Sequence, residues 1–139
     1  MPETRLVRRP IRAEALLGEV AANANGAVVL FLGTVREQND GRAVHGIDYS
    51  AYEPMAEREL AAIAAEAGAD YGVGALVVEH RLGTLGLGEV SVGIAAAHAR
   101  RGPALDAMHY VIEELKRRVP IWKREHYADG TREWVDPSR

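Results

Sequence analysis

Two lysines near the end of the chain, Lys116 and Lys123, are the side chains best suited to chemistry. Pro120 lies between them and must end a helix, because it has no N–H to donate and restricts the residue before it. The resulting turn could bring the two ammonium groups together, and neighbouring ammonium groups depress each other's pKa. A lysine in that state can act as a general acid, a general base or a nucleophile. Residue types alone favour the alternative, a solvated basic helix end.

Arginines at two other places could bind an anionic ligand. Arg100 and Arg101 precede the predicted last helix. The free amides and dipole of a helix N-terminus favour an anion, and guanidinium groups bind phosphate or carboxylate through paired hydrogen bonds. Arg36 follows a predicted strand and borders a polar segment, where it could contact a ligand. For all three, an ordinary solvated arginine is at least as valid an interpretation of the residue types alone.

The composition limits the classes of protein to which the chain could belong. Its 139 residues fit one domain, and its formal net charge of −3 argues against a nucleic-acid-binding protein. The segment 116–124 nevertheless holds five cations and no acid, which indicates a local anionic ligand. No stretch reaches the roughly 20 apolar residues that span a bilayer. The N-terminus lacks the apolar core of a secretion signal, so we expect a cytoplasmic protein without a membrane partner.

The absence of cysteine also restricts the chemistry. It excludes a disulfide, a thiolate nucleophile and a zinc–thiolate site. If this protein moves sulfur, another molecule must carry that sulfur to it. The five histidines show no spacing typical of metal ligands, so we expect neither a metal nor another cofactor.

The hydrophobic pattern predicts the elements that must position these side chains. Strands are predicted at 4–8, 27–32, 44–52, 75–80 and 89–97, and helices at 13–22, 55–67 and 102–119. A terminal hairpin is predicted from 121–127 and 132–135, with Asp129-Gly130 as its turn. The mixture predicts an α+β fold in a single domain over residues 1–139, with a mainly antiparallel sheet, helices packed on one side of it and a C-terminal hairpin.

Several details of this prediction affect where the site would lie. The apolar run 27–32 predicts a buried strand. Segments 36–42 and 81–88 predict loops, the first of them longer than a tight hairpin. Gly68 is expected to end the second helix. The last helix is expected to bury a stripe formed by Leu105, Met108, Ile112, Leu115 and Val119.

Four stretches, taken in order, resemble the large, catalytic subunit of molybdopterin synthase. Together they extend over nearly the whole chain, and the lysine–proline–tryptophan–lysine pattern is the most specific of them. The stretches are 29–36, 49–56, 80–83 with 88–90, and 115–125, the last containing Lys116, Pro120, Trp122 and Lys123.

The resemblance implies an α/β-hammerhead-like fold and a sulfur-transfer reaction. The family converts cyclic pyranopterin monophosphate to molybdopterin by two sulfur transfers. The sulfur arrives as a thiocarboxylate on the C-terminal Gly-Gly of a small β-grasp partner, whose tail enters a pocket of the large subunit. The large subunits form a homodimer at the centre of a heterotetramer.

The resemblance also implies roles for individual residues. Lys116 and Lys123 are the expected catalytic residues, with Lys116 assisting the attack of sulfur. Arginines are expected to hold the substrate phosphate, while Lys123 and Arg124 orient the pterin or the partner's terminus. The expected substrate-binding residues are Thr34, Val35, Arg36, Arg100, Arg101, Lys123, Arg124 and Glu125.

One position departs from the family pattern. The family usually has a His-Arg pair before the last helix, and an alignment without gaps places that pair on Arg100 and Arg101. His98 stands two residues too early and would need a local shift to replace it. We therefore expect Arg100 to be a substituted anion contact, beside the two lysines.

Two other functions fit the residues. The chain could be a non-catalytic binding module that docks an acidic peptide or a nucleotide through its basic segment. It could also be an enzyme that forms a Schiff base through a lysine. The paired lysines around Pro120 and the extent of the resemblance argue against both.

Overall fold

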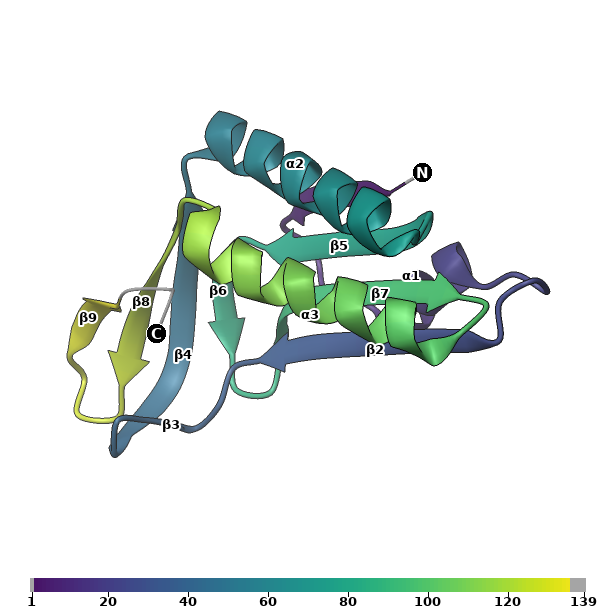
Figure 1. The fold of residues 1–139 in the computed structure, drawn as a ribbon. Helices are drawn as coiled ribbons and strands as arrows, with labels where there is room; N and C mark the ends of the chain where they lie inside the picture. The colour runs from purple at the N-terminus through teal and green to yellow at the C-terminus, as the bar shows by residue number, and fades with distance from the viewer. Residues whose placement is uncertain (1, 136–139) are drawn as a thin grey trace.

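The structure, a computed structural model, describes residues 2–135, and its strands form two sheets (Figure 1). The first sheet has the strand order β1-β5-β7-β2. Its strands are β1 (Glu3–Val7), β5 (Ala75–Arg81), β7 (Val90–His98) and β2 (Ala27–Thr34). Only β1 and β5 pair in parallel; β5 with β7 and β7 with β2 are antiparallel. The predicted α+β class with mainly antiparallel pairing is confirmed.

The second sheet contains the predicted C-terminal hairpin. Its strand order is β3-β4-β8-β9, and β6 also pairs with β4. The strands are β3 (Gln38–Asn39), β4 (Arg42–Ala51), β6 (Gly83–Gly86), β8 (Ile121–Tyr127) and β9 (Arg132–Val135). β4 and β8 pair antiparallel over most of their lengths, so β8 lies beside a strand far from it in sequence.

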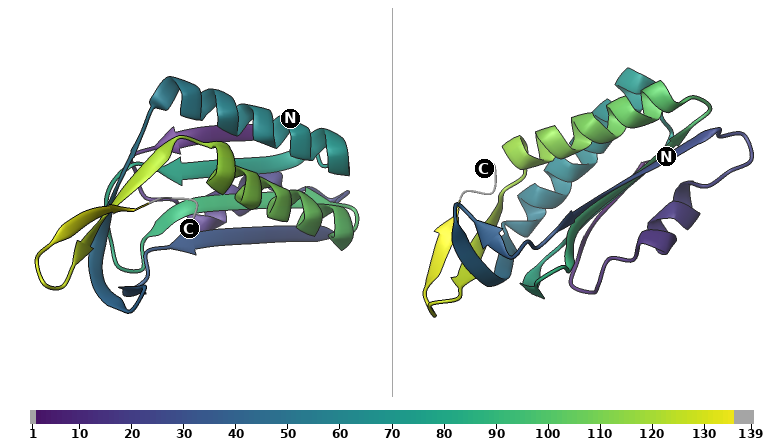
Figure 2. Two further views of the ribbon diagram at one scale, coloured as in Figure 1. Left: turned by 60° about the vertical axis from the view of Figure 1, so that its left-hand side comes forward. Right: turned by 90° about the horizontal axis from the view of Figure 1, so that it is seen from below.

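Helices cover both faces of the first sheet. α2 (Glu53–Tyr71) and α3 (Arg101–Arg118) lie on one face, and α1 (Ala13–Val20) lies on the other (Figure 2). The expectation of helices on one side is therefore wrong for α1. The cause is that β5 and β7 are apolar on both faces: Ile94 packs in the cluster under α2 and α3, whereas Ala95 packs with Leu16 of α1. None of the helices within residues 2–135 is long and apolar enough to cross a membrane.

The helix details differ from the prediction at two places. Leu105 is 45% exposed, because α3 turns its small side chains inward and buries Ala104, Ala107 and Val111 along with Ile112 and Leu115. Gly68 lies inside α2, which continues to Gly72. Gly72 has the left-handed backbone (φ 66°) typical of a helix C-cap.

Both predicted loops contain strands. Asn39 pairs with Arg42, so Asp40 and Gly41 form a two-residue hairpin turn. Both turn residues have positive φ, as the twist of a tight hairpin requires. The segment 81–88 contains β6, which pairs with β4. The β3–β4 hairpin and the pairing of β6 with β4 hold these residues in the second sheet.

The run 27–32 forms β2 as predicted, but the strand is not buried. β2 is an edge strand of the first sheet, so most of its side chains are only half-buried and Val28 is 45% exposed. A continuous apolar run does not distinguish a central strand from an edge strand whose outer face is left open.

Candidate functional site

A pocket of about 310 Å³ lies between the two sheets, beside the C-terminal half of α3. Residues from both sheets and from α3 contribute to its wall. They are Phe31, Gly33, Thr34, Arg36, Asn39, Ile47, Tyr49, Ser91, Val92, Lys116, Lys123 and Glu125. We call this the lysine pocket.

Lys116 and Lys123 both face the lysine pocket. α3 ends at Arg118, and the chain turns through Val119 and Pro120 into β8, so the last turn of the helix and the start of the strand converge. Burial lowers the pKa of Lys116, and the charges of Lys123 and Arg36 lower it further. Lys116 is therefore a lysine whose neutral form is more accessible than usual, the property that acid–base catalysis requires.

A short chain of hydrogen bonds crosses the far wall of the pocket. Arg36 Nη2 donates to Asn39 Oδ1 over 2.9 Å, and Asn39 Nδ2 donates to Glu125 Oε1. Lys123 Nζ lies 4.0 Å from the same carboxylate oxygen. Glu125 is only 1% exposed, and its Oε2 has no hydrogen-bond partner among the described residues. The pocket thus combines three cations with one buried carboxylate that retains a free acceptor.

The pocket also contains two polar side chains, Ser91 and Tyr49, that sequence reasoning did not assign to the site. The Ser91 hydroxyl donates to the Gly33 carbonyl over 3.1 Å. Burial raises the pKa of Tyr49, which also interacts with Ser91. Tyr49 and Ile47, two residues apart on β4, both line the pocket. Sequence reasoning does not identify Asn39 as a site residue, because its segment is predicted to be a loop.

Four of the expected substrate-binding residues lie outside the pocket, and two of them, Arg124 and Val35, are close to it in sequence. Arg124 points to the opposite face of β8 from Lys123, where its Nη2 donates to Asp48 Oδ2 over 2.7 Å. Its guanidinium carbon lies 5.4 Å from the centre of the Trp134 ring. Val35 is 3% exposed and packs in a hydrophobic cluster under the second sheet. Thr34, which precedes it, lines the pocket.

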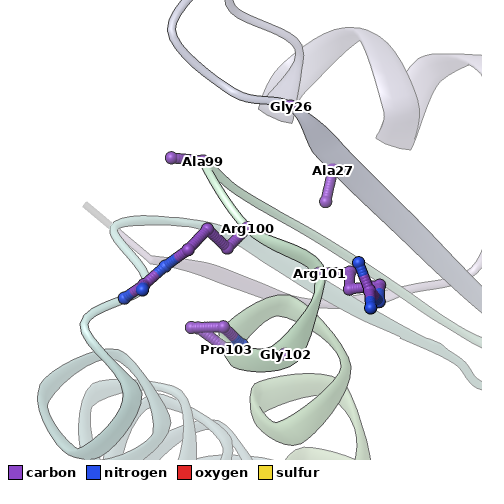
Figure 3. A pocket seen from close by; sticks show the side chains of 7 residues that line it. All are labelled: Gly26, Ala27, Ala99, Arg100, Arg101, Gly102 and Pro103. Atoms are coloured by element: carbon purple, nitrogen blue, oxygen red, sulfur yellow. The ribbon is translucent and has the colours of Figure 1, made fainter.

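Arg100 and Arg101 lie at the other end of α3 from Lys116. They line a separate hollow of about 580 Å³, and their side chains diverge (Figure 3). At a helical rise of about 1.5 Å per residue, Lys116 lies roughly 22 Å further along α3 than Arg101. His98 Nδ1 accepts a hydrogen bond from the Arg100 backbone N–H over 3.0 Å. The anion contact expected beside the lysines is therefore not formed within one chain.

No group of three or more side chains suited to hold a metal ion occurs within residues 2–135. The α+β fold and the lysine pocket define a small protein with a cationic pocket that contains a partly desolvated lysine. Residues 6–118 match the family model described as MoaE protein, and the chain belongs to this family.

Similar proteins and solved structures support membership of the MoaE family. The molybdopterin synthase catalytic subunit of Nostoc sp. is 42% identical over 127 residues, which are 91% of this chain and 77% of the relative. The crystal structure of molybdopterin synthase from Staphylococcus aureus superposes with a TM-score of 0.87 at 37% identity and covers 94% of each chain. A complex of subunits 1 and 2 of the molybdopterin-converting factor from Helicobacter pylori superposes with a TM-score of 0.78 at 25% identity, covering 95% of this chain and 89% of that one.

These findings confirm the predicted family and an enzyme of molybdenum cofactor biosynthesis. The family match ends at residue 118. Lys123 and Glu125 lie beyond it, so their inclusion in the site depends on the geometry of β8.

Proposed function

We propose that this chain catalyses sulfur transfer from a small β-grasp partner subunit to cyclic pyranopterin monophosphate. The sulfur donor is the thiocarboxylate on the C-terminal Gly-Gly of the partner, and the product is the dithiolene of molybdopterin, formed in the cytoplasm. The observation that carries this proposal is the desolvated Lys116 facing Lys123 and Arg36 in one pocket. Since the chain has no cysteine, a sulfur-carrying partner supplies what it lacks.

The pocket offers a partner for each part of the substrate. Arg36 and Thr34 lie on one wall, where a guanidinium group and a hydroxyl suit a phosphate. The free Oε2 of Glu125 can accept a hydrogen bond from an N–H group, and a pterin ring carries such donors. Lys123 lines the same pocket and can orient the carboxyl end of the partner's tail.

Lys116 assists the transfer of sulfur in this proposal. Attack by the thiocarboxylate sulfur gives a thioester between partner and substrate, and water then breaks its acyl–sulfur bond, which leaves the sulfur on the substrate and a carboxylate on the partner. The ammonium form of Lys116 stabilises the negative charge that develops on the carbonyl oxygen in this second step. Its lowered pKa also makes it easier for Lys116 to give up a proton and take it back than for an ordinary lysine. Both roles require the Nζ atom to be held at the pocket wall, which the end of α3 achieves.

Arg100 and Arg101 act, in this proposal, in the pocket of a second copy of the chain. They cannot reach the lysine pocket of their own chain, because α3 separates them from Lys116. We propose that two large subunits form a homodimer within a heterotetramer, and that these arginines bind the anionic substrate in the pocket of the partner copy. Arg101 takes the role of the family arginine and Arg100 that of the family histidine.

A reconstituted reaction tests the function. The protein is mixed with cyclic pyranopterin monophosphate and thiocarboxylated partner, and molybdopterin is measured; we expect product. A partner that ends in an ordinary carboxylate is the matched control and must give none. Binding of the partner's tail without product would support the binding module, and trapping of a carbonyl substrate by borohydride would support a Schiff-base enzyme.

A further inference from the structure

A second, much smaller cavity lies directly behind Lys116. Its volume is about 20 Å³, enough for one water molecule, which needs roughly 10–15 Å³ on this measure. Lys116, Lys123 and Tyr49 line both this cavity and the lysine pocket, so these three side chains form the wall between them. The remaining lining residues are His80, Leu115, Val119 and Ile121.

His80 is the polar group at the back of this cavity. The ring is 5% exposed, and the edge of Tyr49 packs against it, with the ring centres 5.3 Å apart and the planes at 70°. Nδ1 lies 3.0 Å from the carbonyl oxygen of Arg81. Because a carbonyl can only accept, Nδ1 carries the hydrogen. In the neutral ring, Nε2 is then an acceptor, and the ring lines the same cavity as Lys116.

The ring remains neutral at physiological pH. Burial, followed by the charge of Lys116, lowers the pKa of His80 to about 4, despite its hydrogen bond to the Arg81 carbonyl. The cavity therefore places one neutral acceptor opposite two ammonium groups that can only donate. Proteins satisfy such buried polar groups with each other or with a trapped water molecule.

We propose that His80 is a positioning residue for Lys116, and that its Nε2 accepts a hydrogen bond from the Lys116 ammonium group through the one water molecule that the cavity can hold. This bond favours the charged form of Lys116 and fixes Nζ at the wall of the lysine pocket. It counters burial and the repulsion from neighbouring cations. The titratable and charged groups around Lys116 are Arg36 after β2, Tyr49 of β4, His80 of β5, and Lys123 and Glu125 of β8.

The inference is tested on the free protein, before any reaction. NMR of the wild-type protein with ¹⁵N-labelled histidine gives the tautomer of His80. We expect hydrogen on Nδ1 and none on Nε2 from pH 5 to pH 9. An Nε2–H tautomer would overturn the proposal without the need for a variant.

A matched pair of variants tests the coupling to Lys116. His80→Leu removes the acceptor and His80→Gln keeps a neutral one of similar size. The titration midpoint of the Lys116 side chain, followed by NMR and assigned with Lys116→Arg, should fall by about one pH unit in His80→Leu, the scale of one hydrogen bond to a charged group. It should stay near the wild-type value in His80→Gln. An unchanged midpoint in His80→Leu, or equal shifts in both variants, contradicts the proposal.

The kinetic consequence rests on the proposed function. In the reconstituted reaction, the pH profile of kcat for His80→Leu should move to lower pH together with the Lys116 midpoint, while KM stays unchanged. A shifted midpoint with an unshifted kcat profile would exclude a kinetic role for His80. If no molybdopterin forms with the wild-type protein, the proposed function fails, and the two NMR measurements still decide the role of His80.

Discussion

Lys116 differs from the neighbouring cations Arg117 and Arg118 in its surroundings. Arg117 pairs with Glu114, and Arg118 pairs with Glu59 and Glu66 on the outer side of the helices. Lys116 forms no ion pair with another residue in the range 2–135 and faces the lysine pocket, where burial lowers its pKa. Pro120 makes convergence of Lys116 and Lys123 possible, but it is the family resemblance that favours it over a solvated helix end.

The position of Arg124 could have been predicted as well. Side chains alternate along a strand, so Lys123 and Glu125 share one face of β8 and Arg124 must take the other. The family resemblance assigned Lys123, Arg124 and Glu125 to one site, because a sequence motif does not record the direction of each side chain. The roles of Asn39 and His80 were beyond prediction, because each depends on a contact between segments far apart in sequence.

The buried ring of His80 predicts a pH dependence of stability. Its pKa is about 4 in the folded chain and 6.5 ordinarily, so between these values only the unfolded chain binds a proton there. The free energy of unfolding therefore falls as the pH falls from 6.5 to 4, by roughly 3 kcal/mol in total. Urea denaturation of wild type and His80→Gln over this range should show a smaller loss for the variant. Equal losses would contradict the predicted burial of a neutral ring.

At the scale of the elements, the geometry of the site depends on the position of α3 relative to the two sheets. Arg118 near its end joins α2 through Glu66 (2.7 Å) and Glu59 (3.2 Å). The small residues that α3 buries determine how closely it lies on the sheet, and this arrangement could not be predicted from a stripe of large side chains. Leu105 was assigned to the core for that reason, whereas Ala104 and Ala107 occupy it.

Removal of the contact between α2 and α3 should weaken the fold. Arg118→Ala breaks three ion pairs at a half-buried position, and after a discount for solvent screening we expect a loss of about 1 kcal/mol in the free energy of unfolding. Arg117→Ala, at a 69% exposed position with one partner, is the matched control and should behave like the wild type. Chemical denaturation measures both. Equal effects of the two substitutions would contradict a specific role for Arg118.

The contact between β4 and β6 should also tolerate little change. A Cβ atom on Gly46 would lie 2.9 Å from the backbone oxygen of Leu85, so Gly46→Ala must push β6 away from β4. We expect a loss of about 1–3 kcal/mol, the usual cost of overpacking. Gly74→Ala is the control, because no atom lies within 4 Å and its φ is not positive. A Gly46→Ala protein as stable as this control would contradict the tight approach.

At the scale of the whole molecule, the expected site is divided between the two ends of α3. The predicted helix 102–119 already separates Arg101 from Lys116, and α3 holds these two residues near its opposite ends. The lysine pocket and the arginine hollow lie in different parts of one chain. A homodimer that combines them accounts for both sets of cations.

Mixed variants test this division. Lys116→Ala and Arg101→Ala should each lose activity as homodimers. Exchange of subunits between them creates dimers in which one pocket has both wild-type residues, so up to about a quarter of the pockets should recover. Molybdopterin formation before and after exchange measures the recovery. No recovery in mixed dimers, shown by mass spectrometry to have formed, would contradict a pocket shared between copies.

The central claim is that Lys116 takes part in the chemical step. The most direct measurement is a single turnover of Lys116→Ala with saturating thiocarboxylated partner and substrate, with Arg117→Ala as the neighbouring control. We expect a rate lowered by about a hundredfold or more, the usual scale for loss of a general acid or base, with the control unchanged. A rate for Lys116→Ala close to that of the wild type would contradict this claim.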